Sequence, residues 1–420
     1  MRFKAVRGVK DVLPEELTFW QEIERVARGV FELYGYEEIR TPVFESSLLF
    51  ERGIGEGTEI VDKQMYTFLD KKGRNLTLRP EATASVVRAY LEHNLDKKGN
   101  LVQFYYIGPM FRYERPQAGR QRQFWQLGTE LFGSSHPARD AELIGMTLEF
   151  FKELGLENLI TEINSVGCLG CRGSFVSALH EYLQKEKGLL CSDCQIRLEK
   201  NPLRILDCKS EPCKSLVLEG PDIERYLCSG CHSHLKKVEG YLDLLDVSYK
   251  MNSHLVRGLD YYTRTVFEII DRRLGSQDAL AAGGRYDELV KELGGPSTPA
   301  IGFAAGMERI VLALKKDRKM GDKKEKTDFF IASIDEAADG VVLKIAHSLR
   351  TAGLHSKFNC ESRSAKSQAQ LANKLGARFL IIIGEDELRN EEVRPKDMSV
   401  RKLLDPVDLS GIVSWCKEVL

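Results

Sequence analysis

Apolar residues recur along this chain with the two spacings that are typical of helices and strands. The most regular helical run covers residues 15–34, where apolar side chains recur every three or four positions before Gly35. A second run covers 137–154 and ends at Gly155. Shorter runs of strand length lie at 37–41, 64–68, 75–78, 249–252 and 265–270. The pattern predicts an α+β fold.

The most informative pattern is a predicted hairpin with arms at 105–112 and 124–132 and a connection that contains Pro116 and Gly119. Its bend carries Arg112, Arg115, Arg120 and Arg122. Arginine is almost never fully buried without a partner, and its guanidinium fork fits phosphate or carboxylate. We expect an anionic ligand here. An exposed hairpin with solvated charges is the alternative.

A strand-to-helix corner follows the predicted strand 75–78. Arg79, Pro80 and Glu81 lead into a predicted helix at 82–91. Glu81 and Thr83 therefore lie where ligands often bind, but a carboxylate and a hydroxyl there are equally explained as helix caps.

Three further stretches carry residues that a core does not require. Residues 257–262 (RGLDYY) lie between two predicted strands. Residues 281–285 (AAGGR) are small enough for a backbone or a ligand to approach closely, and 286–293 are predicted as helix. Residues 301–309 pass from a small-residue strand into a helix that carries Arg309, which suits either a phosphate or solvent.

Cysteine is concentrated in one segment. Eight of the ten cysteines form four close pairs, three of them CxxC: Cys168 and Cys171, Cys191 and Cys194, Cys208 and Cys213, Cys228 and Cys231. Such pairs suit structural Zn²⁺, as two four-cysteine sites or as one site with spare thiols. His232 or His234 could replace a thiolate. Disulfides are the competing use, but they are uncommon in a reducing cytosol. We expect one or two zinc ions in the protein.

Composition narrows the class of protein. Hydrophobic residues make up 43% of 420, and the apolar runs are too short to span a membrane. The first residues lack the apolar core of a signal peptide, so we expect a cytoplasmic protein. With 61 basic and 62 acidic residues the net charge is −1, and a polyanion would have to be met by local patches.

The last hundred residues predict a separate α/β domain. Residues 315–326 are highly charged without apolar periodicity, which indicates a linker. Predicted strands at 328–333 and 379–383 then alternate with helices at 337–351 and 365–375. This is a βαβ pattern.

Five stretches together resemble class II aminoacyl-tRNA synthetases, and most closely the histidyl-tRNA synthetase family. Residues 31–45 (FELYGYEEIRTPVFE), 110–133 and 302–312 (GFAAGMERIVL) resemble the three motifs of the class. Residues 255–268 (LVRGLDYYTRTVFE) and 281–290 (AAGGRYDELV) resemble two signatures of the histidine family. The resemblance covers nearly the whole chain.

The resemblance implies a fold and a set of domains. An antiparallel class II sheet with flanking helices would occupy residues 1–320, interrupted by a cysteine-rich insertion at 165–240, and an α/β anticodon-binding domain would occupy 327–420. The first motif implies a homodimer interface in the helix and strand at 15–45. Metal binding by the insertion is not implied by the family.

The resemblance also implies an activity: L-histidine is activated with ATP and Mg²⁺ to histidyl-adenylate and transferred to tRNA(His). Arg112 would contact the α-phosphate and the histidine carboxylate, Arg309 the γ-phosphate, and Phe124 the adenine. Negative charge grows on the phosphoryl oxygens during attack, so Arg112 and Arg257 are expected to stabilise the transition state. Loop residues Arg115 and Gln117 would meet the acceptor end of the tRNA.

The same resemblance implies the histidine pocket. Glu81, Thr83 and Gln126 would hold the amino and carboxylate groups, beside Ala82 where the family often has glycine. Glu130 and Tyr262 would recognise the imidazole, with Tyr261 lining the pocket. A site built to hydrogen-bond a ring nitrogen rejects analogues strongly, so no editing domain is expected.

Two other activities are open. A regulatory paralogue of the synthetase binds histidine in histidine biosynthesis without charging tRNA, but it lacks the full set of Arg112, Arg309 and the C-terminal domain. Another class II synthetase with a similar anticodon domain would not carry LVRGLDYY.

Overall fold

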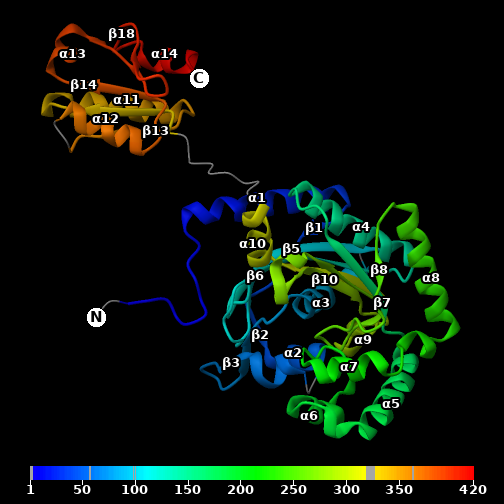
Figure 1. Ribbon diagram of the computed structural model, residues 1–420. Coiled ribbons are helices and arrows are strands. Elements are labelled where there is room, and N and C mark those ends of the chain that lie inside the picture. The colour runs from blue at the N-terminus through cyan, green and yellow to red at the C-terminus, as the bar shows by residue number, and fades with distance from the viewer. Residues whose placement is uncertain (1–2, 56–57, 98, 100, 318–326, 362–363) are drawn as a thin grey trace. The chain divides into compact units, whose positions relative to one another are not determined.

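The chain forms two compact units, residues 1–320 and 321–420. A computed structural model describes residues 3–55, 58–97, 99, 101–317, 327–361 and 364–420 (Figure 1). Each unit is described by itself.

An eight-stranded sheet forms the centre of the first unit, in the order β1-β5-β6-β11-β10-β9-β7-β8. Neighbours from β5 to β7 are antiparallel, and only the two edge pairs, β1 with β5 and β7 with β8, are parallel. In sheet order the strands are β1 (Glu37–Glu38), β5 (Val102–Phe111), β6 (Gln123–Phe132), β11 (Ala300–Gly306), β10 (Ala279–Arg285), β9 (Thr263–Ile270), β7 (Ile160–Ser165) and β8 (Lys250–Met251). The predicted antiparallel class II sheet is confirmed.

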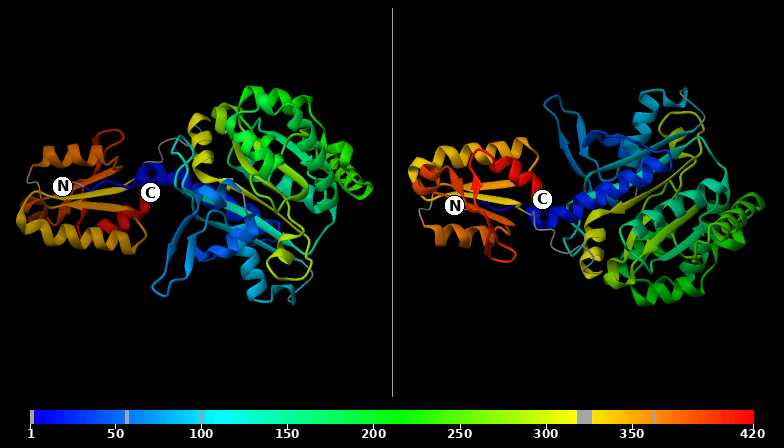
Figure 2. Two further views of the ribbon diagram at one scale, coloured as in Figure 1. Left: turned by 90° about the horizontal axis from the view of Figure 1, so that it is seen from below. Right: turned by 90° about the horizontal axis from the view of Figure 1, so that it is seen from above.

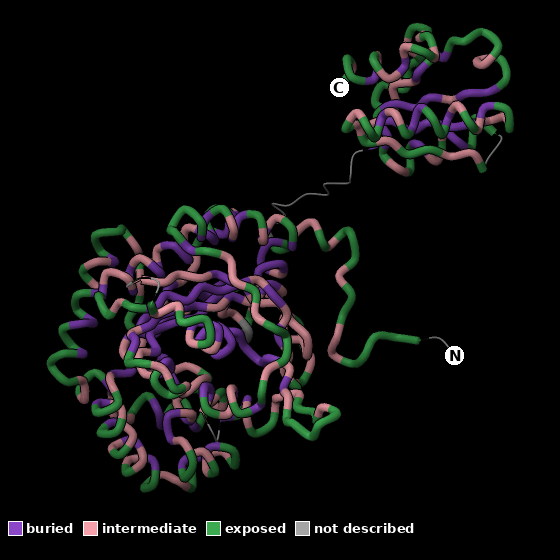
Figure 3. Tube along the Cα trace, turned by 180° about the vertical axis from the view of Figure 1, so that it is seen from behind, coloured by how far each residue is buried: buried purple, intermediate pink, exposed green. Residues whose placement is uncertain are grey.

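Alternate residues of each strand face opposite sides of this sheet. On β6, Leu127 and Leu131 join one hydrophobic core, while Phe132 joins another. Gln126 and Glu130 share the parity of Phe132 and therefore lie on the second face. Buried residues, purple in Figure 3, follow the central strands.

Four helices cover the first face. They are α1 (Pro14–Leu33), α4 (Pro137–Glu153), α8 (Ser229–Leu244) and α10 (Met307–Asp317). The right view of Figure 2 shows α1 (blue) lying along the sheet. The predicted helices 15–34 and 137–154 are confirmed, because α1 and α4 differ from them by one residue or less at each end. Both helices end shortly before the predicted stop residues Gly35 and Gly155.

Smaller elements complete the second face. Helices α3 (Thr83–Glu92) and α9 (Leu289–Glu292) pack there. A three-stranded sheet, β2 (Phe44–Ser46), β4 (Asn75–Leu78) and β3 (Tyr66–Leu69), lies beside α2 (Ser47–Ile54). Its β3–β4 hairpin projects from the unit in Figures 1 and 2. Helix α9 is shorter than the predicted 286–293.

The cysteine-rich segment is helical: α5 (Leu169–Lys185), α6 (Ser192–Lys200), α7 (Glu211–Glu219) and the start of α8. Its buried Phe175, Leu179 and Val217 belong to the same core as Val266 and Tyr262 of the sheet. The segment therefore extends the core of the second face.

One buried carboxylate ties three of these elements together. Asp140 of α4 accepts hydrogen bonds from Thr265 of β9 (2.6 Å) and pairs with His234 of α8 (2.8 Å) and Arg285 of β10. Asp140 and Arg285 are both fully buried. Within the described chain His234 is thus engaged with Asp140 and lies outside both cysteine groups.

Asp140→Ala would remove one of the two carboxylates that pair with the fully buried Arg285, and with it the acceptor of Thr265 and the partner of His234. We expect it to lower the free energy of unfolding by about 3–5 kcal/mol, measured by urea denaturation followed through tryptophan fluorescence. Glu153→Ala, exposed on the same helix, is the control and should change stability by less than about 0.5 kcal/mol. Equal stability of the two variants would show that the Asp140 network is energetically neutral.

The second unit is an α/β fold. Its sheet has the order β13-β12-β14-β16-β17, with β13, β12 and β14 parallel. Helices α11 (Asp339–Thr351) and α12 (Ala365–Lys374) connect β12 (Phe329–Ser333), β13 (Ser356–Asn359) and β14 (Phe379–Ile383). Beyond them lie α13 (Glu385–Asn390), β15 (Glu392–Val393), β16 (Lys396–Asp397), β17 (Lys402–Leu403), β18 (Val407–Asp408) and α14 (Ile412–Glu418).

The predicted βαβ pattern is confirmed, but β13 escaped prediction. Its sequence SKFN is short and two of its residues are exposed, so it carries no apolar alternation. The predicted linker starts too early, because Lys315 and Lys316 still belong to α10. Its remaining part, 318–326, lies outside the described residues.

Candidate active site

A polar cavity of about 410 Å³ lies on the second face of the eight-stranded sheet. Strands β5, β6, β9, β10 and β11 form its floor, and the start of α3 and of α10 line its ends. Ten of the predicted site residues line it: Glu81, Thr83, Arg112, Phe124, Gln126, Glu130, Arg257, Tyr261, Tyr262 and Arg309. Pockets of this volume commonly hold small ligands.

Gly302 in β11 leaves room for the Glu130 side chain in the floor of the cavity. Gly302 pairs with Glu130 across the sheet. A Cβ at position 302 would meet the Glu130 carboxylate and lie 2.5 Å from the Thr129 carbonyl oxygen. The small residues that the sequence places here therefore serve a close approach between Glu130 and the neighbouring strand.

Three arginines from distant parts of the sequence line this one cavity: Arg112, Arg257 and Arg309. Burial lowers the pKa of Arg309, and the positive charges of Arg120 and Arg112 lower it further. Burial also lowers the pKa of Arg112. Mutual repulsion of this kind marks a cluster of cations that an added polyanion would stabilise.

Each of these arginines is held by its own surroundings. Arg112 donates from Nε to the Pro80 carbonyl (2.8 Å), and Arg309 donates from Nη1 to the Ala279 carbonyl (2.7 Å). The guanidinium carbon of Arg112 lies 5.4 Å from the centre of the Phe124 ring. These contacts fix the two side chains at the cavity wall.

Arg257 is paired with Glu268. Burial lowers the pKa of Arg257, but the combined attraction of Glu268, Tyr262, Asp207 and Tyr261 outweighs it, and the pKa is raised. Arg257 Nε is buried without a hydrogen-bond partner among the described residues. Glu268 therefore holds the guanidinium at the cavity wall with one donor unused.

The opposite end of the cavity is built around Glu130. Its carboxylate accepts from the Thr83 hydroxyl (2.6 Å) and from the Tyr286 hydroxyl. Burial raises the pKa of Glu130 to about 8. A carboxylate so far from water binds its donors strongly and is costly to leave unpaired.

Glu81 has the helix-capping role that we weighed against ligand binding. Its carboxylate accepts from the backbone N–H groups of Thr83 (2.7 Å) and Ala84 (2.9 Å) at the start of α3. It also lines the cavity, so the cap does not exclude contact with a ligand. Burial raises the pKa of Glu81.

Like Arg257 Nε, Gln126 Oε1 and the Tyr106 hydroxyl lie in the cavity wall and are buried without a hydrogen-bond partner in the described part of the chain. Unsatisfied groups of this kind are uncommon in folded proteins, and they point to a ligand with complementary donors or acceptors.

Three predicted residues lie outside the cavity wall. Ala82 is buried behind the Glu81 corner. Arg115 and Gln117 are exposed in the loop of the β5–β6 hairpin, where Gln117 and Arg120 exchange backbone hydrogen bonds of 2.9 and 3.0 Å.

Sequence reasoning missed several residues of the site. Tyr286 and Tyr106 are aromatic and were predicted only as helix or strand residues, although Tyr286 directly follows the glycines of AAGGR. Asp207, Lys209 and Glu268 also line the cavity. Asp207 and Lys209 come from the cysteine-rich segment, and no local pattern indicates that this segment reaches the sheet.

The eight paired cysteines come together as two groups of four. One group is Cys168, Cys171, Cys228 and Cys231, and the other is Cys191, Cys194, Cys208 and Cys213. Within each group the sulfur atoms all lie within 4.8 Å of one another, and all eight are free thiols. Of the two arrangements that we left open, the geometry is that of two four-cysteine groups.

A family model described as histidyl-tRNA synthetase matches residues 8–170 and 223–310, more than half of the chain. The chain belongs to the histidyl-tRNA synthetase family. The predicted resemblance is confirmed, and the stretch that this match skips, 171–222, is the interior of the cysteine-rich segment. A second family model, described as an anticodon binding domain, matches residues 328–419.

Full-length relatives agree with this family. The histidine–tRNA ligase of Halothermothrix orenii is 50% identical over 95% of both chains, and that of Natranaerobius thermophilus is 47% identical over the whole of both. The crystal structure of apo S. aureus histidyl-tRNA synthetase matches with a TM-score of 0.82 and 37% identity, covering 99% of this chain and 100% of that one. The regulatory paralogue is not favoured. No helix in the described ranges is long and apolar enough to cross a membrane.

Proposed function

We propose that this chain activates L-histidine with ATP to form histidyl-adenylate and then transfers the histidyl group to tRNA(His). One observation carries the proposal: a single cavity joins three arginines to a buried carboxylate that already accepts two hydroxyl hydrogen bonds. The arginine end suits a triphosphate, and the carboxylate end suits a ring N–H donor.

The first step is attack on phosphorus. A carboxylate oxygen of histidine attacks the α-phosphorus of ATP, the bond to the β-phosphate oxygen breaks, and pyrophosphate leaves with that electron pair. Negative charge grows on the α-phosphoryl oxygens during the attack. Arg112 and Arg257 would donate hydrogen bonds to these oxygens, which stabilises the transition state more than the substrate complex.

Other residues of the same cavity would hold ATP. The Phe124 ring would stack on the adenine, and Arg309 would bind the γ-phosphate. Mg²⁺ would be held by the phosphate oxygens and would neutralise their charge. Asp278, a carboxylate of the cavity wall, would complete its ligands, since Glu268 is already paired with Arg257 and oxygen donors fit the ion.

The buried end would select histidine. Glu81 and the unpartnered Gln126 Oε1 are acceptors suited to the α-amino group, beside Thr83. Glu130 would accept from the imidazole, with Tyr262 as its second contact and Tyr261 closing the pocket. Histidine would supply the buried Glu130 with a donor, and an amino acid without a ring N–H would leave that position unfilled.

Transfer would use groups at the edge of the site and the second unit. The terminal ribose hydroxyl of tRNA attacks the carbonyl carbon of the adenylate, and AMP leaves. Arg115 and Gln117, exposed in the hairpin loop, are suited to the acceptor end. We assign catalysis to residues 1–320, with the insertion at 165–240, and anticodon binding to residues 327–420.

We also infer that the chain works as a homodimer through residues 15–45. The apolar face of α1 is used within its own chain, where Trp20, Ile23 and Phe31 are buried. Leu33 and Phe44 remain largely exposed at the ends of this stretch. An interface would therefore use these flanking residues and not the apolar stripe of the helix. Structural Zn²⁺, bound by the paired cysteines, is the remaining cofactor of the proposal.

The test is ATP–pyrophosphate exchange with each of the twenty amino acids in turn, followed by charging of total tRNA. We expect exchange that depends on histidine, and transfer of labelled histidine to one tRNA species. Histidine binding without exchange would instead identify a regulatory protein. Exchange driven by another amino acid would show that the Glu130 pocket has been assigned the wrong ligand.

A further inference from the structure

The two cysteine groups are nested along the chain. The pairs at 168/171 and 228/231 form the outer group, and the pairs at 191/194 and 208/213 form the inner group between them. Sequence spacing does not fix this pairing, since four pairs can be divided into two groups in three ways.

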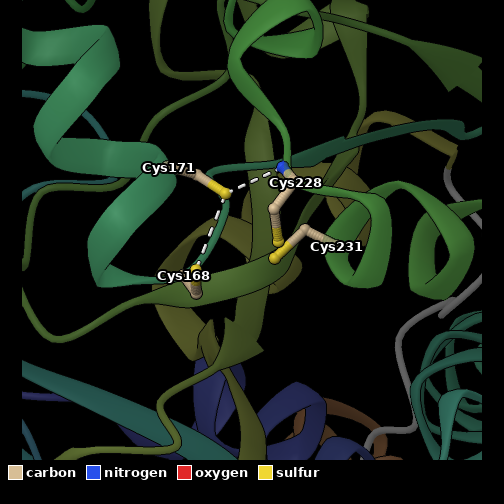
Figure 4. A group of neighbouring side chains, drawn as sticks. All are labelled: Cys168, Cys171, Cys228 and Cys231. Atoms are coloured by element: carbon tan, nitrogen blue, oxygen red, sulfur yellow. Dashed lines mark hydrogen bonds between the residues drawn. The ribbon is translucent and has the colours of Figure 1, made fainter.

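The sulfur positions fit tetrahedral zinc and not disulfides. The sulfurs of Cys168 and Cys171 are 3.6 Å apart, and those of Cys191 and Cys208 are 3.8 Å apart. Four thiolates at the Zn–S distance of ~2.3 Å lie ~3.8 Å from one another in a tetrahedron. A disulfide would require ~2.05 Å. Figure 4 shows the side chains of the outer group turned toward one another from two segments.

Backbone N–H groups already point at these sulfurs. Cys228 N donates to Cys171 Sγ (3.0 Å) in the outer group, and Cys191 N donates to Cys213 Sγ (3.3 Å) in the inner one. Hydrogen bonds from outside the ligand set offset the negative charge of a four-thiolate site and orient its ligands. Cys168, Cys191 and Cys228 also precede the first residues of α5, α6 and α8, where the helix dipole favours a thiolate.

The inner group lies next to the active-site cavity. Cys208 stands between Asp207 and Lys209, which both line that cavity. The ten residues between α6 and α7 contain only a short 3₁₀ turn, Pro202–Ile205. Such a connection has little regular hydrogen bonding of its own, so a bound ion at Cys208 would supply much of its order.

The same connection holds Asp260, which lies in the middle of the 257–262 segment. Arg204 donates to the Asp260 carboxylate (2.9 Å) and to the Arg257 carbonyl (2.7 Å), and Asn201 donates to the other carboxylate oxygen of Asp260 (3.0 Å). Arg172, in the first turn of α5, donates to the Asp260 carbonyl (2.5 Å). The 257–262 segment is a loop without helix or strand, so these contacts position it.

We propose that the chain binds two Zn²⁺ ions, one in each nested cysteine group, and that the inner ion positions Arg257, Tyr261 and Tyr262 through the contacts of Arg204 and Asn201 with Asp260. The zinc sites stand on the cysteine geometry alone. The positioning role rests on the proposed function, because it concerns how the 257–262 segment meets its substrates.

Metal analysis of the full-length protein tests the pairing. We expect two zinc ions per chain by mass spectrometry of the metal. The double variant Cys208→Ser with Cys213→Ser should keep only the outer ion. The double variant Cys168→Ser with Cys171→Ser should keep only the inner ion. Cys360→Ser, outside both groups, is the control and should keep two. A wild-type protein without zinc, or one that loses both ions with a single pair of substitutions, would overturn the two-site assignment.

The positioning role is tested with a variant that keeps both zinc ions. Arg204→Gln removes the contacts to Asp260 and Arg257 and should retain two zinc ions. We expect it to raise the histidine KM in exchange by ~10–100-fold, as outer-shell substitutions commonly do, with a smaller change in the ATP KM. The inner-group double serine variant should show the same split, and hydrogen exchange of 257–262 should rise in both. Lys214→Gln, exposed on α7, is the matched control.

The outcomes separate the two proposals. Two zinc ions with no histidine-dependent exchange in the wild type would refute the proposed function and leave the metal sites intact. Normal histidine KM and normal hydrogen exchange in Arg204→Gln would refute the positioning role, because the buried Leu203 and Ile205 would then be sufficient to order the connection.

Discussion

Glu130→Gln is expected to raise the histidine KM by ~10–10²-fold, because an amide offers one acceptor oxygen where the carboxyl group has two oxygens. Thr83 and Tyr286 both donate to the native carboxylate, so the amide would also disturb these two bonds. The ATP KM should change by less than about threefold, since we place ATP at the other end of the cavity. Steady-state exchange with each substrate varied separately measures both. Equal weakening of the two substrates would contradict imidazole recognition by Glu130.

The same variant should also remove the part of the pH dependence of stability that comes from Glu130. Burial raises the pKa of Glu130 from its usual 4.5 to about 8. Between these values the folded protein keeps a proton that the unfolded chain has lost, so this group makes the folded state less stable as pH rises from 4.5 to 8. The melting temperature of Glu130→Gln, measured relative to the wild type, should therefore be higher at pH 8 than at pH 5. Glu153→Gln, on the exposed end of α4, is the control.

Removal of the Arg257 guanidinium is expected to lower the rate of pyrophosphate exchange by ~10²–10³-fold. Arg257→Ala alone would leave the partly buried Glu268 without its partner, and burial already raises the pKa of Glu268. The exchange rate of the double variant, Arg257→Ala with Glu268→Gln, is therefore compared with that of Glu268→Gln alone. The loss should fall on kcat, because Arg257 is expected to bind charge that develops in the transition state.

Arg257→Lys in the same background tests the geometry of the donor. Lysine keeps the positive charge and loses the planar fork, so we expect only partial recovery of kcat. Exchange that stays near the rate of the Glu268→Gln control after Arg257→Ala would show that Arg257 has no part in the chemistry.

Local pattern predicted the most strongly periodic elements of this fold. Helix α1 and strands β6 and β14 carry strong periodicity and clear end signals, and their observed bounds differ from the predicted ones by one residue or less. Strand β13 is short and half exposed, and helix α9 is a single turn, so neither has a pattern long enough to define it.

Residues of the site could be predicted from the sequence where a charged side chain lies in an apolar strand or directly beside one. Arg112 follows an apolar strand, and Glu130 lies within one. Tyr286 and Tyr106 gave no such signal, because a buried tyrosine is ordinary in a core. The approach of Asp207 to the sheet depends on how a helical segment folds back over 257–262, and no local spacing encodes that.

The nested order of the cysteine groups has a consequence for synthesis on the ribosome. The inner group is complete once Cys213 has been made, and its Cys191 and Cys208 are 17 residues apart. The outer group waits for Cys228 and Cys231, and its Cys171 and Cys228 are 57 residues apart. The shorter span also costs less entropy to close. The part of the insertion that reaches the catalytic pocket is thus the first to offer four thiols to the proposed Zn²⁺, before strand β9 has left the exit tunnel.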